Sequence, residues 1–126
     1  MAVDMLQHIN IHAADVERSK DFYVRVLGLR VGPRPPVASV GYWLYLGDQP
    51  VIHLVQKASG APPAGGNGSI DHVAFRGVDL VSTRDVLYAE GVSFREAVIP
   101  RDQSTQLFFH DPDGVKIELN FDSHQA

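Results

Sequence analysis

The chain repeats itself, and this internal repeat constrains the fold more than any single motif does. The segment QHINIHAADVERSKDFYVRVLGL in the first half matches DHVAFRGVDLVSTRDVLYAEGV in the second half. The alignment that places His8 on His72 also places Asp15 on Asp79. Such a repeat predicts two structural units of the same plan within 126 residues.

The repeat continues to the end of each half. GDQPVIHL in the first half corresponds to DPDGVKIEL in the second, and this correspondence brings His53 opposite Glu118. Two equivalent positions in each half therefore carry side chains that can bind a metal: His8 and His53 in the first half, His72 and Glu118 in the second.

Size and charge narrow the class of protein. A chain of 126 residues with 44% hydrophobic content is long enough for one compact domain with a substantial core. The net charge of −4 gives no electrostatic footprint for nucleic acid, and no apolar run approaches the roughly 20 residues that span a bilayer. We therefore expect a small-molecule substrate, and neither a nucleic acid nor a membrane as a partner.

The chain contains no cysteine, which excludes disulfides, cysteine-based zinc sites and thiol nucleophiles. Any metal must bind through histidine and carboxylate side chains. The N-terminal segment MAVDMLQHIN has neither the basic start nor the apolar stretch of a signal peptide, so we expect a cytoplasmic location.

Each half is predicted to fold as one strand, one helix and three further strands. Alternating apolar and polar residues predict the strands, and apolar residues at helical spacing predict the helices. Asp15 and Asp79 are suited to cap the helix starts, and Gly28 and Gly91 to close the helix ends. The predicted strands of the second half are residues 70–76, 93–99, 106–110 and 115–121. Those of the first half are residues 5–13, 40–46 and 51–56, and residues 30–36 take the place of the second strand there.

Residues 30–36 are rich in proline and glycine, and we expect a turn or an irregular edge there. We call residues 5–56 module 1 and residues 70–122 module 2. Between them, residues 57–69 (KASGAPPAGGNGS) have the composition of a flexible linker. The predicted fold class is α+β, with two βαβββ modules in tandem within one domain, residues 1–126. A linker of this length would also allow two chains to exchange modules in a dimer.

Strand alternation predicts which way the four candidate ligands face. In strand 51–56 the apolar neighbours of His53 would cover the helix, which leaves His53 on the opposite face. The same reasoning places Glu118, His8 and His72 on the faces away from the helices. Two such sheets facing each other would enclose three imidazoles and one carboxylate. This donor set suits Zn²⁺, Ni²⁺, Mn²⁺, Fe²⁺ or Co²⁺, acting as a Lewis acid on a substrate oxygen.

Several other side chains are candidates for a substrate pocket. Trp43 and Tyr45 share one face of a predicted strand, although aromatic residues in a sheet more often serve packing. Arg101 stands in a loop where it could meet an anionic substrate, although a solvated loop charge is the simpler interpretation. The full set of pocket candidates is Asn10, Trp43, Tyr45, Arg101, Gln106 and Phe108.

The chain resembles the vicinal oxygen chelate superfamily, which includes glyoxalase I, fosfomycin-resistance proteins, extradiol dioxygenases and bleomycin-resistance proteins. The resemblance rests on QHINIHAADVERSKDFYVRVLGLRVG, DHVAFRGVD and FFHDPDGVKIELNF, and it covers nearly the whole chain. It implies a glyoxalase-like fold in which two βαβββ modules form a U-shaped cleft around one divalent metal ion. For a chain of this length it also implies a homodimer.

The resemblance implies that His8, His72 and Glu118 are metal ligands. His53 departs from glyoxalase I, where the corresponding place holds a glutamate that ligates the metal and takes part in proton transfer. We therefore expect His53 to be a fourth metal ligand or a base. Glu118 is expected to take part in catalysis as well as in metal binding.

These residues predict a metal-dependent lyase or isomerase that acts on a small oxygenated substrate through a metal-stabilised enolate. An extradiol-type ring-cleaving dioxygenase or a fosfomycin-type thiol transferase is an alternative, because its set of two histidines and one glutamate does not need His53. A metal-free binding or resistance protein is the non-enzymatic alternative. Bleomycin-binding members, however, lack the metal residues that this chain carries.

Overall fold

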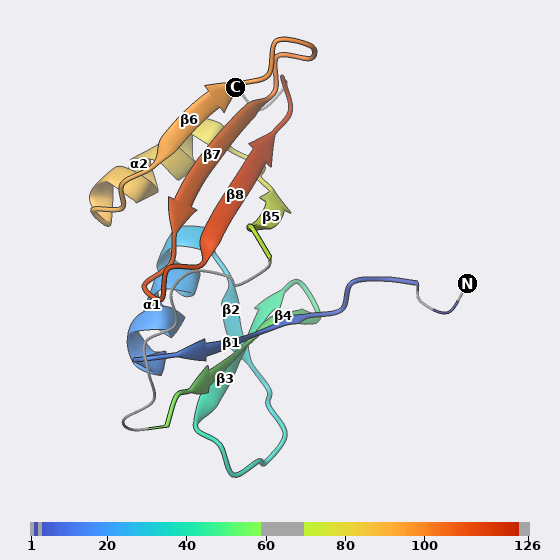
Figure 1. The fold of residues 1–126 in the computed structure, drawn as a ribbon, viewed down its shortest axis with the longest axis vertical. Coiled ribbons are helices and arrows are strands. Elements are labelled where there is room, and N and C mark those ends of the chain that lie inside the picture. Colours follow the sequence, from blue (N-terminus) through green and yellow to red (C-terminus); the bar gives the residue numbers. More distant parts are fainter. Residues whose placement is uncertain (1, 3, 59–69, 124–126) are drawn as a thin grey trace. The chain divides into compact units, whose positions relative to one another are not determined.

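The computed structural model describes residue 2, residues 4–58 and residues 70–123, and the chain divides into two compact units, residues 1–63 and 64–126. Each unit contains one helix and one four-stranded sheet (Figure 1). This confirms the predicted α+β fold of tandem βαβββ modules. A single domain with a U-shaped cleft stays a prediction, and residues 59–69 of the predicted linker lie outside the described residues.

Module 1 places its first and last strands side by side. Its elements are β1 (Ile9–Ala13), α1 (Val16–Leu27), β2 (Arg30–Gly32), β3 (Gly41–Leu46) and β4 (Gln49–Gln56). The strand order in the sheet is β1-β4-β3-β2. β1 runs parallel to β4, whereas the other neighbours are antiparallel.

Module 2 repeats this arrangement. Its elements are β5 (Val73–Arg76), α2 (Leu80–Ala89), β6 (Arg95–Val98), β7 (Thr105–His110) and β8 (Lys116–Phe121). The strand order is β5-β8-β7-β6, with β5 parallel to β8. Among the described residues, no helix has the length and apolarity that crossing a membrane requires.

Both helices begin at the aspartates that the sequence predicts as caps. The Oδ1 atom of Asp15 accepts a hydrogen bond from the backbone N–H of Arg18 at 3.2 Å. Asp79 does the same for the N–H of Ser82 at 3.1 Å. Each carboxylate thus satisfies a backbone donor that has no partner inside the helix.

The glycines that follow the helices adopt the expected left-handed conformation. Gly28 has φ of 74° directly after α1, and Gly91 has φ of 68° two residues beyond the end of α2 at Ala89. A residue with a Cβ atom is strained at such angles. The chain therefore turns back toward the sheet at the predicted points.

The prediction of a turn or irregular edge for residues 30–36 is wrong at its start. Arg30–Gly32 forms the edge strand β2, which pairs antiparallel with β3. An edge strand needs partners on one side only, so a short run before Pro33 can pair. Gly32 also leaves room for Tyr45, since an added Cβ atom would lie 2.6 Å from that ring.

The first strand of each module is shorter than the alternation predicts. β1 begins at Ile9 rather than at residue 5, and β5 begins at Val73 rather than at residue 70. The cause is the parallel partner, because the register with β4 begins at Ile9 and the register with β8 begins at Val73. His8 and His72 therefore lie just before their strands.

Each module has its own core between helix and sheet. In module 1 the largest fully buried side chains are Tyr23, Leu44, Ile52 and Leu54, and in module 2 they are Leu80, Leu87, Leu107, Phe109, Ile117 and Phe121. The apolar neighbours of His53 and Glu118 thus face the helix side, as predicted. The opposite face of each sheet, here called the open face, carries the polar positions.

Candidate functional site

His72 and Glu118 form a close pair on the open face of module 2. The Nε2 atom of His72 lies 3.3 Å from the Oε1 atom of Glu118. Glu118 is 9% exposed, so its carboxylate lies largely within the protein. The spacing suits two donors on one metal ion, because bonds of about 2.1 Å place adjacent donor atoms roughly 3.0–3.4 Å apart.

The imidazole of His72 and the carboxylate of Glu118 each have a further hydrogen-bond partner outside the pair. Asp71 Oδ2 lies 2.8 Å from His72 Nδ1, and Asn120 Nδ2 donates to Glu118 Oε2 at 2.8 Å. Gln106 Nε2 in turn donates to Asn120 Oδ1 at 3.1 Å. Such outer partners fix the orientation of a ligating imidazole or carboxylate.

Asp71 and Asn120 were not among the predicted site residues. Two signals in the sequence could have indicated them: Asn120 stands two positions after Glu118, on the same strand face, and Asp71 directly precedes His72. The contact with His72 holds the pKa of Asp71 below its usual value, and Lys116 acts in the same direction. Asp71 is thus a carboxylate at neutral pH.

In module 1, His8 and His53 form a stacked pair. Their ring centroids lie 3.8 Å apart with 9° between the planes. Trp43 stacks on His53 as well, at 4.1 Å and 12°. Gln7 Oε1 lies 3.0 Å from His8 Nδ1, so Gln7 contacts His8 as Asp71 contacts His72.

His53 is 9% exposed and has a defined hydrogen bond. Its Nε2 atom lies 3.1 Å from the Pro50 carbonyl oxygen, which can only accept, so Nε2 carries the proton and Nδ1 the lone pair. Burial lowers the pKa of His53, and His8 acts in the same direction, while the Pro50 carbonyl opposes both. The imidazole is therefore neutral at neutral pH.

The four predicted ligands thus form two pairs, one in each module. Across residues 4–58 and 70–123, no three His, Cys, Asp or Glu side chains gather in a group that could hold a metal ion. The meeting of His8 and His53 with His72 and Glu118 around one ion stays a prediction.

Three of the pocket candidates are near these pairs. Asn10 stands opposite His53 in the register of β1 with β4, and Trp43 stands opposite His53 from β3. Phe108 stands opposite Glu118 in the register of β7 with β8. All three share an open face with a predicted ligand.

Two further candidates are engaged or exposed elsewhere. Tyr45 donates its hydroxyl to the Pro33 carbonyl at 2.5 Å, which favours the packing interpretation. Arg101 is exposed in the loop that joins β6 to β7. This loop meets β7 at Thr105, which is the opposite end of that strand from His110.

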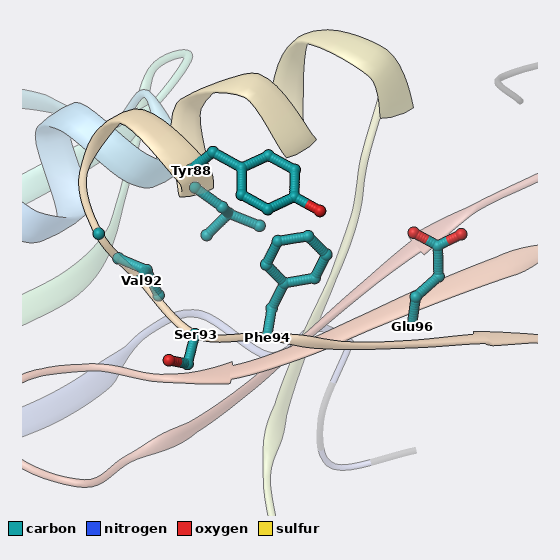
Figure 2. A pocket seen from close by; sticks show the side chains of 7 residues that line it. Tyr88, Val92, Ser93, Phe94 and Glu96 are labelled. Atoms are coloured by element: carbon teal, nitrogen blue, oxygen red, sulfur yellow. The ribbon is translucent and has the colours of Figure 1, made fainter.

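Module 2 also has two hollows that the sequence did not predict. One lies between α2 and β6, with a volume of about 560 Å³, where the rings of Tyr88 and Phe94 meet at 5.3 Å (Figure 2). The other, of about 370 Å³, is lined by residues that include Arg95, Phe108 and Lys116. Of these residues, Phe108 stands opposite Glu118 in the register of β7 with β8.

The repeat, the fold and the paired side chains define a class of protein. The model of the Glyoxalase/Bleomycin resistance protein/Dioxygenase superfamily matches residues 5–119, and the chain belongs to this family.

Two relatives agree with this assignment, and a solved structure shares the fold. The chain is 31% identical over 125 residues to "Glyoxylase I 4" of Arabidopsis thaliana, covering 94% of this chain and 71% of the relative. It is 30% identical over 105 residues to "Putative ring-cleaving dioxygenase MhqA" of Bacillus subtilis (strain 168), covering 77% of this chain and 33% of that protein. The fosfomycin resistance protein FosX of Listeria monocytogenes has the same fold, with a TM-score of 0.76 at 16% identity over 96% of this chain and 95% of FosX.

Proposed function

We propose that this protein is a divalent-metal-dependent enzyme that acts as a lyase or isomerase on a small oxygenated substrate. The observation that carries the proposal is the His72–Glu118 pair, whose donor atoms lie 3.3 Å apart and are each held from behind. The similarity to "Glyoxylase I 4", of whose length the chain covers 71%, supports this class of reaction.

In this proposal His8, His72 and Glu118 hold the metal ion. Imidazole and carboxylate donors suit Zn²⁺, Ni²⁺, Mn²⁺, Fe²⁺ or Co²⁺. When bound, the ion supplies Lewis acidity toward a substrate oxygen. The protein contributes pre-oriented donors, since Asp71 directs the Nε2 atom of His72 and Asn120 fixes the plane of the Glu118 carboxylate.

We assign His53 the role of base rather than that of fourth ligand. Its Nε2 atom already donates to Pro50, and its ring is held between those of His8 and Trp43. The lone pair on Nδ1 can take a proton from the substrate and return it to another atom of the same molecule, which is the proton balance of an isomerisation.

Metal titration tests the ligand set. Protein stripped with a chelator and reloaded with each of the five ions is expected to bind one ion per proposed site in calorimetry and metal analysis. Glu118→Gln is expected to weaken binding at least about 100-fold, whereas the matched variant Glu90→Gln, on the exposed end of α2, leaves it unchanged. Failure of the reloaded protein to bind any of the ions contradicts the proposal.

The role of His53 is tested separately. As a base, His53→Gln keeps the metal affinity within a few-fold and abolishes turnover. As a fourth ligand, the same variant would lose metal affinity to the extent that His72→Gln does. The two roles thus predict different metal affinities for His53→Gln, so calorimetry distinguishes them before any substrate is identified.

The reaction class is tested with methylglyoxal–thiol adducts, catechols and fosfomycin. Oxygen uptake with a catechol would indicate the extradiol alternative, which the similarity to MhqA supports over about one third of that protein's length. Thiol consumption with fosfomycin would indicate the transferase alternative. Tight ligand binding that His72→Ala and Glu118→Ala leave unchanged would indicate a metal-free binding protein.

We also propose that the chain forms a homodimer, in which the two pairs meet either within one chain or between chains. A mixture of His8→Ala and Glu118→Ala variants distinguishes these cases. Each variant alone lacks one ligand in every site. If the pairs meet between chains, mixed dimers contain one intact site, and metal binding returns on mixing; if they meet within a chain, it does not.

A further inference from the structure

Two of the residues that line the hollow of about 370 Å³ in module 2 are sheet neighbours of Glu118. Phe108 lines it and stands directly opposite Glu118 in the register of β7 with β8. Lys116 lines it too, two residues before Glu118 on β8 and therefore on the same face of the sheet. The hollow is therefore lined by residues that flank Glu118 in the sheet, although Glu118 itself does not line it.

The hollow has a positive rim. The guanidinium carbon of Arg95 lies 4.3 Å from the centroid of the Phe108 ring, and the Lys116 Nζ atom lies 5.4 Å from it. Both cations are attracted to the negative ring face, which holds them in position at the edge of the hollow. Among the described residues that line the hollow there is no carboxylate.

The nearby carboxylates contact these two cations to different extents. Glu96, next to Arg95 in sequence, is bound on the opposite face by the guanidinium of Arg84 at 2.6 Å and 2.7 Å. Within the described part of the chain, Arg95 takes part in no ion pair. Lys116 contacts Asp71 at 3.4 Å, a longer contact than the 2.8 Å between Asp71 and His72.

An aromatic ring lies next to the two cations. Phe108 lines the hollow and contacts both of them, whereas the ring of Phe94, which also lines the hollow, points toward Tyr88 of α2 (Figure 2). An aromatic ring beside two cations suits a ligand that joins an apolar body to an anionic group.

We propose that Arg95 and Lys116 bind the anionic group of the substrate, so that the substrate is a small organic anion with a carboxylate or phosphonate on an apolar body. This inference rests on the proposed function, because the oxygenated end of the same molecule would reach Glu118 and His72. Arg95 stands two strands from Glu118, roughly 10 Å at the usual strand spacing, which a small substrate can span.

Binding of model anions to the metal-free protein tests the inference. The probes are benzoate, phenylphosphonate and, as the uncharged match, benzamide, each followed by calorimetry and by backbone amide shifts in β6 and β7. At least one anion is expected to bind roughly tenfold more tightly than benzamide. Arg95→Gln and Lys116→Gln are each expected to lower the affinity for that anion by a similar factor without changing the circular dichroism spectrum.

Arg18→Gln is the matched control, since it removes one positive charge from the exposed side of α1 in module 1. It is expected to leave anion affinity unchanged. Equal affinity for benzamide and both anions, or an equal loss in Arg18→Gln and Arg95→Gln, would overturn the inference. The anion titration uses metal-free protein, so its result does not depend on whether the protein binds a metal ion. If the protein binds a metal ion but shows no preference for the anions, this inference is overturned and the proposed function is not.

Discussion

The imidazole of His53 lies parallel to that of His8 on one side and to the indole of Trp43 on the other, at centroid distances of 3.8 Å and 4.1 Å. Three flat rings, from the residue before β1, from β4 and from β3, thus form one continuous stack across the sheet. The stack fixes the plane of His8, which is one of the proposed ligands.

Removal of the middle ring should destabilise module 1. His53→Ala is expected to lower the free energy of unfolding by about 1–3 kcal/mol, because a buried ring and its hydrogen bond to Pro50 are lost. His53→Phe keeps a ring in the stack and should lose less. Urea unfolding measures the change, and an unaltered midpoint for His53→Ala would contradict the packing role.

Trp43 provides a second readout of the same stack, since it is the single tryptophan in the chain. Its emission is expected to shift in His53→Ala, because the ring that covers one indole face is gone. His53→Phe should preserve an emission maximum close to that of the natural protein. Identical spectra for all three proteins would indicate that the rings do not stack in solution.

The hydrogen bond behind His72 should matter for metal affinity. Asp71→Ala removes the carboxylate that lies 2.8 Å from His72 Nδ1, and we expect metal affinity to fall about 10- to 100-fold. The exposed Asp85→Ala on α2 is the matched control and should not change affinity. Calorimetric titration with Zn²⁺ measures both, and an unaffected Asp71→Ala would show that Asp71 does not orient the ligand.

The Arg84–Glu96 pair should make stability depend on pH. Hydrogen bonds from Arg84 lower the pKa of Glu96, and partial burial opposes this shift. The pKa of Glu96 in the folded protein lies below its ordinary value, so the pair stabilises the fold at pH values above that ordinary value. This stabilisation is lost as the pH falls through the folded pKa. Both side chains are about one third exposed, so the gain at pH 7 is at most about 1 kcal/mol.

Glu96→Gln tests this dependence. The variant is expected to be less stable than the natural protein at pH 7, and the difference is expected to shrink as the pH falls through the folded pKa of Glu96. Urea unfolding at pH 7 and at a series of lower pH values measures the difference. A stability difference that stays constant between them would show that the charge of Glu96 is not its cause.

Two glycines in module 1 should differ in their tolerance of alanine. A Cβ atom on Gly41 would lie 2.0 Å from the Leu54 carbonyl oxygen, a backbone atom that cannot move without breaking the pairing of β3 with β4. We expect Gly41→Ala to cost about 3 kcal/mol or more. Gly47 has φ of 61° and open space, so Gly47→Ala should cost about 1–2 kcal/mol. Thermal unfolding measures both, and the reverse order would contradict the prediction.

The sequence predicted those parts of the fold that depend on local chemistry. The caps Asp15 and Asp79 and the glycines Gly28 and Gly91 act on their own helices, so their roles can be read without knowledge of distant contacts. The open-face position of Glu118 follows from strand alternation in the same way.

The contacts within the candidate site depend on strand register, which the sequence pattern does not encode. The stack of Trp43 on His53 requires β3 to pair with β4 at that register position. The strand at Arg30–Gly32 was missed because pairing with β3 outweighs the local preference of a segment rich in proline and glycine. Asn120 was missed because its importance comes from a hydrogen bond to Glu118 rather than from its residue type.

The parallel pairing of β1 with β4, and of β5 with β8, has a consequence for how such a chain can vary. The members of each pair, His8 with His53 and His72 with Glu118, come from the two ends of a module that are fastened together. Insertions or deletions in the segments between those ends lengthen or shorten peripheral loops and leave the spacing of the pair intact. The surroundings of the site can therefore diverge in length and shape while its chemical centre stays constant.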